Sequence, residues 1–554
     1  MCESTPMVKP LTVSEEDDAE ARISRRRILP LNIKPVVAVA VVAAALSIAS
    51  FVYFFANGMT NVYGDGVAHV NIARKVVDSP DDSAWQRYMQ IGSPWLPLQT
   101  VLMLPLAAND WMWRTGAAGS FISMLSFIVA TLFLYLLARS FYGKEEGRWR
   151  ELLPLLSAGV FAINPSVLYL QSTPMSEVLF MAALVTAVYF LQRWVNEPGA
   201  RRLAIAALAM TVATLTRYEA WPVAALSIII VALASSGDRK NRIKNVALYS
   251  SVIAIGPIYW LWHNWAIYGN ALEFLSGPNS ARGIYLQNRV NFAWSQMFVG
   301  NAALDLLTMA AAVAVCVGPF VSLLGVAGFF RRLIAERRSL VQTSPALLFI
   351  VTFLFHVWSM YRGEIQVFPV SAFGLLNVRY GLPHVMAVAL FAPSAVMLFK
   401  TASRQRVYAV ICVIVAAQYI YLVSEGPAQL AMYQEGLRNG VNARTVRQRS
   451  KVSSYIALHP PEGFVLMHTG ALGPVVSQGD IRYSQVIHEG TARWHQIEES
   501  IPEDVSTVIV QRGDPLAERI SGSAALLGEL STEYEDRFSV GNITVFERRK
   551  SGNR

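Results

Sequence analysis

Residues 35–56 read PVVAVAVVAAALSIASFVYFFA, a run without a single charged side chain. About 20 apolar residues are enough for a helix to cross the hydrocarbon core of a bilayer. The preceding stretch, RISRRRILPLNIK, is basic, as in a signal peptide, but the apolar run is too long for the core of such a peptide. We therefore expect a retained first membrane helix with its basic flank in the cytoplasm.

Further apolar blocks follow this helix, and the composition of the whole chain fits a membrane protein. Of its 554 residues, 54% are hydrophobic and only 15% are charged, whereas soluble proteins carry about 25% charged residues. The net charge of +9 comes from short basic clusters between the blocks, where the positive-inside rule places them. This pattern indicates membrane orientation and argues against nucleic-acid binding. The three cysteines show no disulfide or zinc spacing, and we expect no metal and no cofactor.

The alternation of apolar blocks and basic clusters predicts the topology. With every cluster on one side, residues 35–423 form about eleven transmembrane helices. The tail 1–34 is then cytoplasmic and partly disordered, and the C-terminus is extracytoplasmic. The apolar stretch 93–108 is short and interrupted by prolines, so we expect an interfacial or re-entrant segment. The chain is thus predicted to be a multi-pass protein of the plasma (inner) membrane.

Residues 424–554 have a different composition, because polar residues return and the apolar runs shorten. Alternation of apolar and polar residues predicts a small extracytoplasmic α/β domain without a recognisable catalytic motif. The predicted strands are 463–468, 505–512 and 541–549. The predicted helices are 491–501 and 515–530.

Ionisable side chains are costly inside a bilayer and mark function by default. Here they gather at the predicted outer ends of the helices. Asp65 and His69 follow the first helix in NVYGDGVAHV (61–70), and Glu177 lies in STPMSEVLF (172–180). The others are Arg217 with Tyr218 and Glu219, His263, and Arg379 with Tyr380 and His384. Their common depth predicts a reaction or binding site at the outer face and disfavours a transporter, whose polar groups lie near the midplane.

The order of these motifs resembles that of the GT-C integral-membrane glycosyltransferases. The branch most similar holds the protein O-mannosyltransferases and the lipid A aminoarabinose transferase. Besides the two stretches above, the resemblance rests on SPWLPLQTVLMLPL (93–106), LTRYEAWP (215–222), HNWAIYGNALEF (263–274) and NVRYGLP (377–383). It implies transfer of a sugar from a polyprenyl-phosphate carrier to a lipid, polysaccharide or protein acceptor at the outer face. Many relatives carry a second acid where this chain has Gly66, and a WWDxG-type oligosaccharyltransferase signature is missing.

Such a transfer needs a base for the acceptor hydroxyl, and Asp65 is the candidate. The alternative is that Asp65 caps the helix that follows it. His69 lies on the same helical face and is predicted to orient the carboxylate or contact the sugar, unless it is only structural. Arg217 and Arg379 suit the carrier phosphate because a guanidinium offers paired donors. The alternative for both is that they reach lipid headgroups.

The remaining candidates have weaker signals. Glu177 either binds the sugar or the acceptor, or only favours the dipole of the helix it opens. Tyr218 and Tyr380 are substrate contacts or members of an aromatic belt, and His263 contacts sugar hydroxyls or anchors the interface. Arg282 belongs to a loop, 273–283, that could cover the site. The rival function is a transporter or flippase of a lipid-linked sugar, which would move the donor across the bilayer without consuming it.

Overall fold

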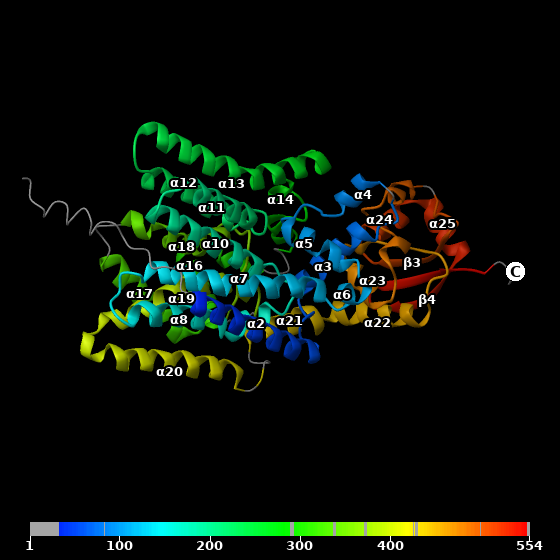
Figure 1. Ribbon diagram of the computed structural model, residues 1–554. Coiled ribbons are helices and arrows are strands. Elements are labelled where there is room, and N and C mark those ends of the chain that lie inside the picture. Colours follow the sequence, from blue (N-terminus) through cyan, green and yellow to red (C-terminus); the bar gives the residue numbers. More distant parts are fainter. Residues whose placement is uncertain are drawn as a thin grey trace, which may run out of the picture.

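The computed structural model describes residues 33–81, 83–288, 293–335, 340–369, 374–424, 426, 430–498 and 500–550. A bundle of long helices fills one part of the molecule, and a smaller domain with a sheet adjoins one end of it (Figure 1). Cys2 and the predicted cytoplasmic tail, except its residues 33 and 34, lie outside the described residues.

Among the described residues, seven helical segments are long and apolar enough to cross a bilayer. Six of them are single helices: α2 (Ile33–Ala56), α7 (Ala117–Phe141), α10 (Glu177–Asn196), α13 (Arg239–Tyr268), α18 (Leu340–Tyr361) and α20 (Arg404–Val423). The seventh is a continuous segment made of η2 (Val378–His384), α19 (Val385–Phe391) and η3 (Ala392–Leu398). α16 (Ala302–Val317) and α17 (Pro319–Ala335) are bent by 113° relative to each other. If they form one broken span, they are an eighth crossing.

Three further predicted crossings also fall on helices, but these helices are short. They are α8 (Trp149–Ala162), α11 (Ala200–Thr214) and α12 (Ala220–Ala234), with 14, 15 and 15 residues. A helix rises 1.5 Å per residue, so each is shorter than the roughly 30 Å of a hydrocarbon core. A polytopic helical fold is therefore confirmed, whereas the number of about eleven crossings is not.

The break between α16 and α17 has a local cause. Gly318 adopts φ +100°, which disfavours any residue with a side chain, and Pro319 cannot donate a backbone hydrogen bond. A Cβ at Gly318 would collide with the side chain of Gln418 on α20. Gln418 instead uses its Oε1 to accept the backbone N–H groups of Phe320 and Val321 at 2.9 and 3.2 Å.

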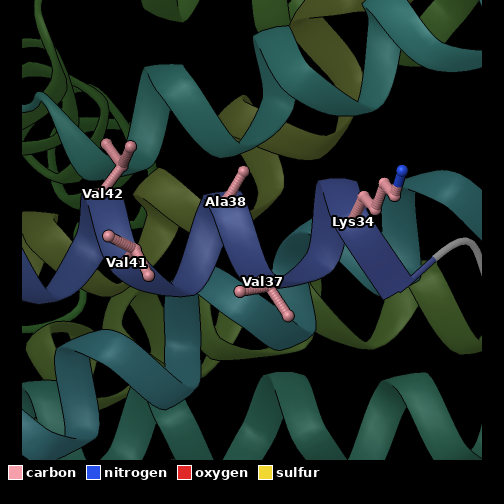
Figure 2. Close-up of a pocket in the computed structure, with 5 residues that line it drawn as sticks. All are labelled: Lys34, Val37, Ala38, Val41 and Val42. Atoms are coloured by element: carbon pink, nitrogen blue, oxygen red, sulfur yellow. The ribbon is translucent and has the colours of Figure 1, made fainter.

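Burial distinguishes central from peripheral helices. Most of α10 is buried, and it packs against α7, α11 and α18. Little of α2 and α20 is buried, with 11% and 22% of their apolar windows inside the structure, as expected for helices that face lipid. Figure 2 shows a pocket on the first turns of α2, lined by Lys34, Val37, Ala38, Val41 and Val42. Its lining is aliphatic except for the Lys34 ammonium, so it suits an acyl chain better than a polar reactant.

The basic clusters meet at one end of the bundle. The Arg332 guanidinium, near the end of α17, donates to the carbonyl of Phe141 at the end of α7 over 2.8 Å. Arg148, before α8, donates to Gln405 at the start of α20 over 2.8 Å. The end of α10, the start of α11 and the start of α13 carry further basic residues of this group. Glu177, at the first residue of α10, therefore lies at the opposite end.

That opposite end carries four short helices from the first connecting segment: α3 (Gly64–Val77), α4 (Ala84–Met89), α5 (Leu98–Ala107) and α6 (Asp110–Arg114). They lie beside the C-terminal domain (Figure 1). Most of the apolar stretch 93–108 forms α5, which packs against α3 and α7. A later long connection at this end, between α13 and α16, forms α14 (Glu273–Ser276), α15 (Ala281–Asn288) and η1 (Ala293–Met297).

The C-terminal domain is built on a five-stranded sheet in the order β2-β1-β3-β5-β4. The strands are β1 (Phe464–Met467), β2 (Val486–Ile487), β3 (Val505–Gln511), β4 (Tyr534–Val540) and β5 (Ile543–Arg548). β1 pairs in parallel with β2 and β3, whereas β5 is antiparallel to β3 and β4. The helices are α21 (Ala431–Gly436), α22 (Arg444–Leu458), α23 (Thr469–Gln478), α24 (Pro515–Gly522) and α25 (Ala524–Glu533).

The three predicted strands are confirmed, but both helix predictions in this domain need correction. Within 491–498, 500 and 501, the residues of this stretch that the structure describes, the only helical element is a 3₁₀ helix, Ala492–Gln496. The helix predicted over 515–530 divides at Ser523, whose hydroxyl accepts the backbone N–H of Leu526 and so starts a second helix. Strand β4 and helices α22 and α23 were not predicted, because their apolar patterns are short and interrupted by charged residues or glycine.

Candidate active site

Asp65 is the second residue of α3, and Tyr63 occupies the capping position. The capping alternative for Asp65 is therefore wrong. Its carboxylate instead accepts a hydrogen bond of 2.5 Å from the guanidinium of Arg379. The residue after Asp65 must be small, because a Cβ at Gly66 would lie 2.9 Å from Cγ of Pro174. This contact gives a physical reason why position 66 holds glycine and not a second acid.

Arg379 links Asp65 to Glu177. Its Nε donates to Oε1 of Glu177 at 3.2 Å, and its side chain is 9% exposed. Arg379 is the second residue of η2, and Asn377, the residue before η2, has φ +52°. Glu177 opens α10 and is fully buried, so its charge is stabilised by partners and not only by the helix dipole.

Arg217 extends the network to a third acid. It donates to Oε1 of Glu177 at 2.9 Å and to Oε1 of Glu219 at 2.8 Å. The ring of Tyr380 lies 5.2 Å from the Arg217 guanidinium and 5.4 Å from that of Arg379, within the range of cation–π attraction. Tyr380 therefore packs inside the site and not in an interfacial belt.

A fourth acid, Glu435 of α21, was missed by the sequence interpretation. Its carboxylate accepts the backbone N–H groups of Asn377 and Val378 at 2.7 and 3.0 Å and lies 3.6 Å from Arg379. Tyr63 donates to the neighbouring carbonyl of Met432 at 2.6 Å. Burial raises the pKa of Glu435, although Arg379 and the two backbone donors oppose this. No spacing in the sequence relates Glu435 to η2, so only the fold reveals it.

We call this set the ion cluster. Its members are Asp65, Glu177, Arg217, Glu219, Arg379 and Glu435.

Two histidines continue the network into the bundle. Nε2 of His356 lies 3.0 Å from Oε1 of Glu219, and its Nδ1 lies 3.3 Å from Nε2 of His384. Thr352 follows at 3.3 Å from His384. His356 was overlooked, although a histidine within the apolar run FLFHVWSM (353–360) is the kind of residue that marks a functional site in a membrane segment.

His69 lies one helical turn after Asp65 and is buried, with its ring 4.8 Å from that of Trp95. Its Nδ1 has no hydrogen-bond partner among the described residues, and neither has Oε2 of Glu177. Burial lowers the pKa of His69 to about 4, although the charges of Asp65 and Glu177 act in the opposite direction. His69 is therefore neutral at physiological pH.

Three other candidates lie outside the ion cluster. Tyr218 accepts from Trp260 at 2.9 Å and donates to the carbonyl of Pro94 at 3.2 Å. His263 is held between the hydroxyl of Tyr88 and a backbone carbonyl, at 2.6 and 2.8 Å. Tyr218 and His263 therefore hold the segment 84–97 in place. The third candidate, Arg282, is exposed to solvent on α15. Their substrate-binding roles remain predictions.

Exposure separates Asp65 from the other acids of the ion cluster. Its side chain is 41% exposed, whereas those of Glu177, Glu219 and Glu435 are 0%, 5% and 3% exposed. Among the acids of the cluster, Asp65 is thus the one that a substrate can reach without displacing protein.

Known proteins resemble the chain in sequence and in fold. Residues 112–262, which hold three members of the ion cluster, match the family model of the dolichyl-phosphate-mannose-protein mannosyltransferases. The structure is similar to ArnT from Cupriavidus metallidurans bound to undecaprenyl phosphate, with 14% identity and a TM-score of 0.53, over 94% of this chain and 98% of that one.

The structure is also similar to the oligosaccharyltransferase of Archaeoglobus fulgidus in complex with Zn and sulfate. The identity is 14% and the TM-score 0.50, over 87% of this chain and 70% of that one. The chain has the GT-C fold. No curated protein matches its sequence. The expected resemblance to GT-C proteins is confirmed, and the chain is an integral membrane protein.

Proposed function

We propose that this protein transfers a glycosyl group from a polyprenyl-phosphate carrier to an acceptor hydroxyl, with Asp65 as the general base. The observation that carries the proposal is the ion cluster. Its side chains come from α3, α10, the connection between α11 and α12, η2 and α21, and they meet at one end of an apolar bundle. The ArnT structure similar to this one contains undecaprenyl phosphate, which supports a lipid-phosphate donor.

Asp65 fits the role of base by accessibility and by charge. An acceptor that approaches from solvent meets its carboxylate before the buried acids. Its ion pair with Arg379 orients the carboxylate, which can take the proton of the acceptor hydroxyl as that oxygen attacks the anomeric carbon. His69, neutral and with an unpaired Nδ1, is proposed to contact the sugar.

Arg379 is proposed to exchange partners during the transfer. The ion cluster has four acids and two arginines, so a bound phosphate adds negative charge to a site with an excess of it. When Asp65 takes the proton, its charge is neutralised while the bond between the sugar and the phosphate breaks. The departing phosphate gains one negative charge at that moment, and the Arg379 guanidinium released by Asp65 can stabilise it.

The position of the ion cluster within the bundle supports an extracytoplasmic location for the site. The Lys/Arg-rich connections lie at the opposite end, as the contacts of Arg332 and Arg148 demonstrate. Short connections with an excess of positive charge favour the cytoplasmic side. We therefore propose that the ion cluster and the C-terminal domain face outward, with the predicted cytoplasmic tail on the other side.

The test follows the fate of a labelled donor. The purified protein is placed in liposomes with sugar-labelled undecaprenyl or dolichyl phosphates, and membranes from cells lacking the protein supply acceptors. The proposal predicts that label moves to an acceptor and that free polyprenyl phosphate accumulates. Movement of intact donor between leaflets without its consumption would support the flippase alternative and refute the transferase.

A further inference from the structure

Helix α3 carries the candidate base at its start and contacts the C-terminal domain along its second half. Lys75 donates to the hydroxyl of Thr469 at 2.5 Å and lies 3.5 Å from Oε1 of Glu489. Glu489 in turn accepts the backbone N–H of Thr469 at 2.8 Å. The ammonium also lies 5.6 Å from the ring of Tyr483.

The place of these contacts in the sheet is specific. Thr469 is the first residue of α23, two positions after the end of β1, and Glu489 lies two positions after β2, which is parallel to β1. The carboxyl ends of parallel strands form the crevice in which α/β domains commonly hold a ligand. Here Lys75 of α3 enters that crevice, at the N-terminus of α23. The domain thus uses its binding edge to hold a part of its own chain.

Other contacts fix the axis of α3 on the same domain. Asp78 accepts the backbone N–H of Tyr483 at 3.0 Å and pairs with Arg74 at 2.9 Å. Arg74 also pairs with Asp110 of α6 at 2.6 Å. On the apolar side, Val70 and Ala73 belong to one buried cluster with residues of the C-terminal domain, namely Val452, Ile456, Leu472 and Val475.

We propose that the C-terminal domain is a positioning element of the active site, and that Lys75 is the residue through which it sets the place of Asp65. The proposal rests on the function proposed above. Asp65 and Lys75 share one continuous helix of 14 residues, so a tilt at the Lys75 end moves the carboxylate at the other end. Displacement of a reacting group by about 1 Å can cost a factor of about 100 in rate.

The experiment compares Lys75→Met with Lys550→Met. Lys550 also pairs with a glutamate, Glu462, at 2.9 Å on the C-terminal domain, but both side chains are exposed to solvent. Methionine keeps the aliphatic length in both variants and removes the charge. Transfer kinetics are measured in liposomes, and hydrogen exchange is measured for the amides of residues 64–77. Lys75→Arg serves as the conservative variant.

The proposal predicts that Lys75→Met lowers kcat by about ten- to a hundredfold, leaves the KM of the donor nearly unchanged and speeds exchange in α3. Lys75→Arg should recover most of the kcat, and Lys550→Met should match the wild type. A folded Lys75→Met protein with wild-type kcat and wild-type exchange would overturn the proposal.

Two further outcomes remain decisive. If Lys75→Met does not fold, Glu489→Gln removes the other charge of the pair, and the same two results are read from that variant. If the wild type transfers no sugar, the proposed function fails, and the exchange of residues 64–77 alone decides whether the C-terminal domain holds α3.

Discussion

The Arg379 guanidinium binds the Asp65 carboxylate across 314 positions of sequence. The same guanidinium binds the buried Glu177. One arginine therefore connects an accessible acid to an inaccessible one, and its charge is shared between them. Loss of either acid leaves Arg379 with an incomplete set of partners, which makes the two acids energetically coupled.

Replacement of Arg379 by lysine should impair donor turnover. Lysine keeps the charge but cannot hold two carboxylates with a planar fork. We expect the kcat for donor discharge to fall by about 100-fold, since the orientation of Asp65 is lost. The matched control is Arg148→Lys at the basic end of the bundle, where the arginine contacts Gln405. The measurement is the rate at which the labelled donor is consumed in liposomes. Equal effects of the two substitutions on this rate would contradict a special role for Arg379.

Gly66→Ala should be far more damaging than Gly64→Ala. The Cβ at position 66 would lie 2.9 Å from Pro174 and 3.3 Å from the sulfur of Met175, whereas no atom lies within 4 Å of one at position 64. Overpacking of this kind costs about 1–3 kcal/mol. Here it would also push the start of α3, and with it Asp65, away from the segment that precedes α10. Thermal unfolding and transfer rates measure both effects. A Gly66→Ala protein as stable and active as Gly64→Ala would show that α3 does not pack as described.

Glu435→Gln tests the acid that only the fold revealed. The N–H groups of Asn377 and Val378 donate to different oxygens of Glu435, so the amide keeps an acceptor for only one of them, and it also loses the charge that faces Arg379. We expect a lower melting temperature and a kcat reduced by about tenfold, since an imperfectly held arginine orients Asp65 less well. Glu462→Gln, at an exposed ion pair, is the control. If both variants behave as wild type, Glu435 has no positioning role.

Stability should fall when the pH drops below 6.5, and His69 should contribute to this fall. Its pKa is about 4 in the folded protein, below its ordinary value of 6.5. The unfolded chain therefore binds the proton first as the pH decreases, and the free energy of unfolding declines between pH 6.5 and 4 by up to about 3 kcal/mol. The decline should be shallower in His69→Gln when unfolding is followed at pH 7, 6, 5 and 4. Parallel curves for both proteins would refute this assignment.

The helical fold could be predicted because the bilayer imposes a simple rule on composition. Uncharged runs such as 35–56 have to become helices that satisfy their own backbone. The number of crossings could not be predicted, because helices such as α11 and α12 are shorter than a bilayer and are accommodated by their neighbours. The bend at Gly318 depends on Gln418 of a distant helix, and no local pattern reports such a contact.

The site was predictable in part for the same reason. Charges that avoid the apolar core collect at helix ends, which placed Asp65, Glu177, Arg217 and Arg379 at one depth before their contacts were known. The identity of their partners depends on which helices are neighbours. Glu435 lies in a polar segment where an acid is unremarkable, so hydropathy gave no reason to select it.

The rate of sugar transfer in a single turnover by Asp65→Asn tests the central claim most directly. Asparagine has nearly the same shape but cannot accept the acceptor's proton. We predict a fall in the transfer rate of about 10²–10⁴-fold, with donor binding retained because Arg379 then lacks a competing carboxylate. Asp536→Asn, on an exposed part of β4, should behave as wild type. A transfer rate near that of the wild type in Asp65→Asn would contradict the claim that Asp65 is the base.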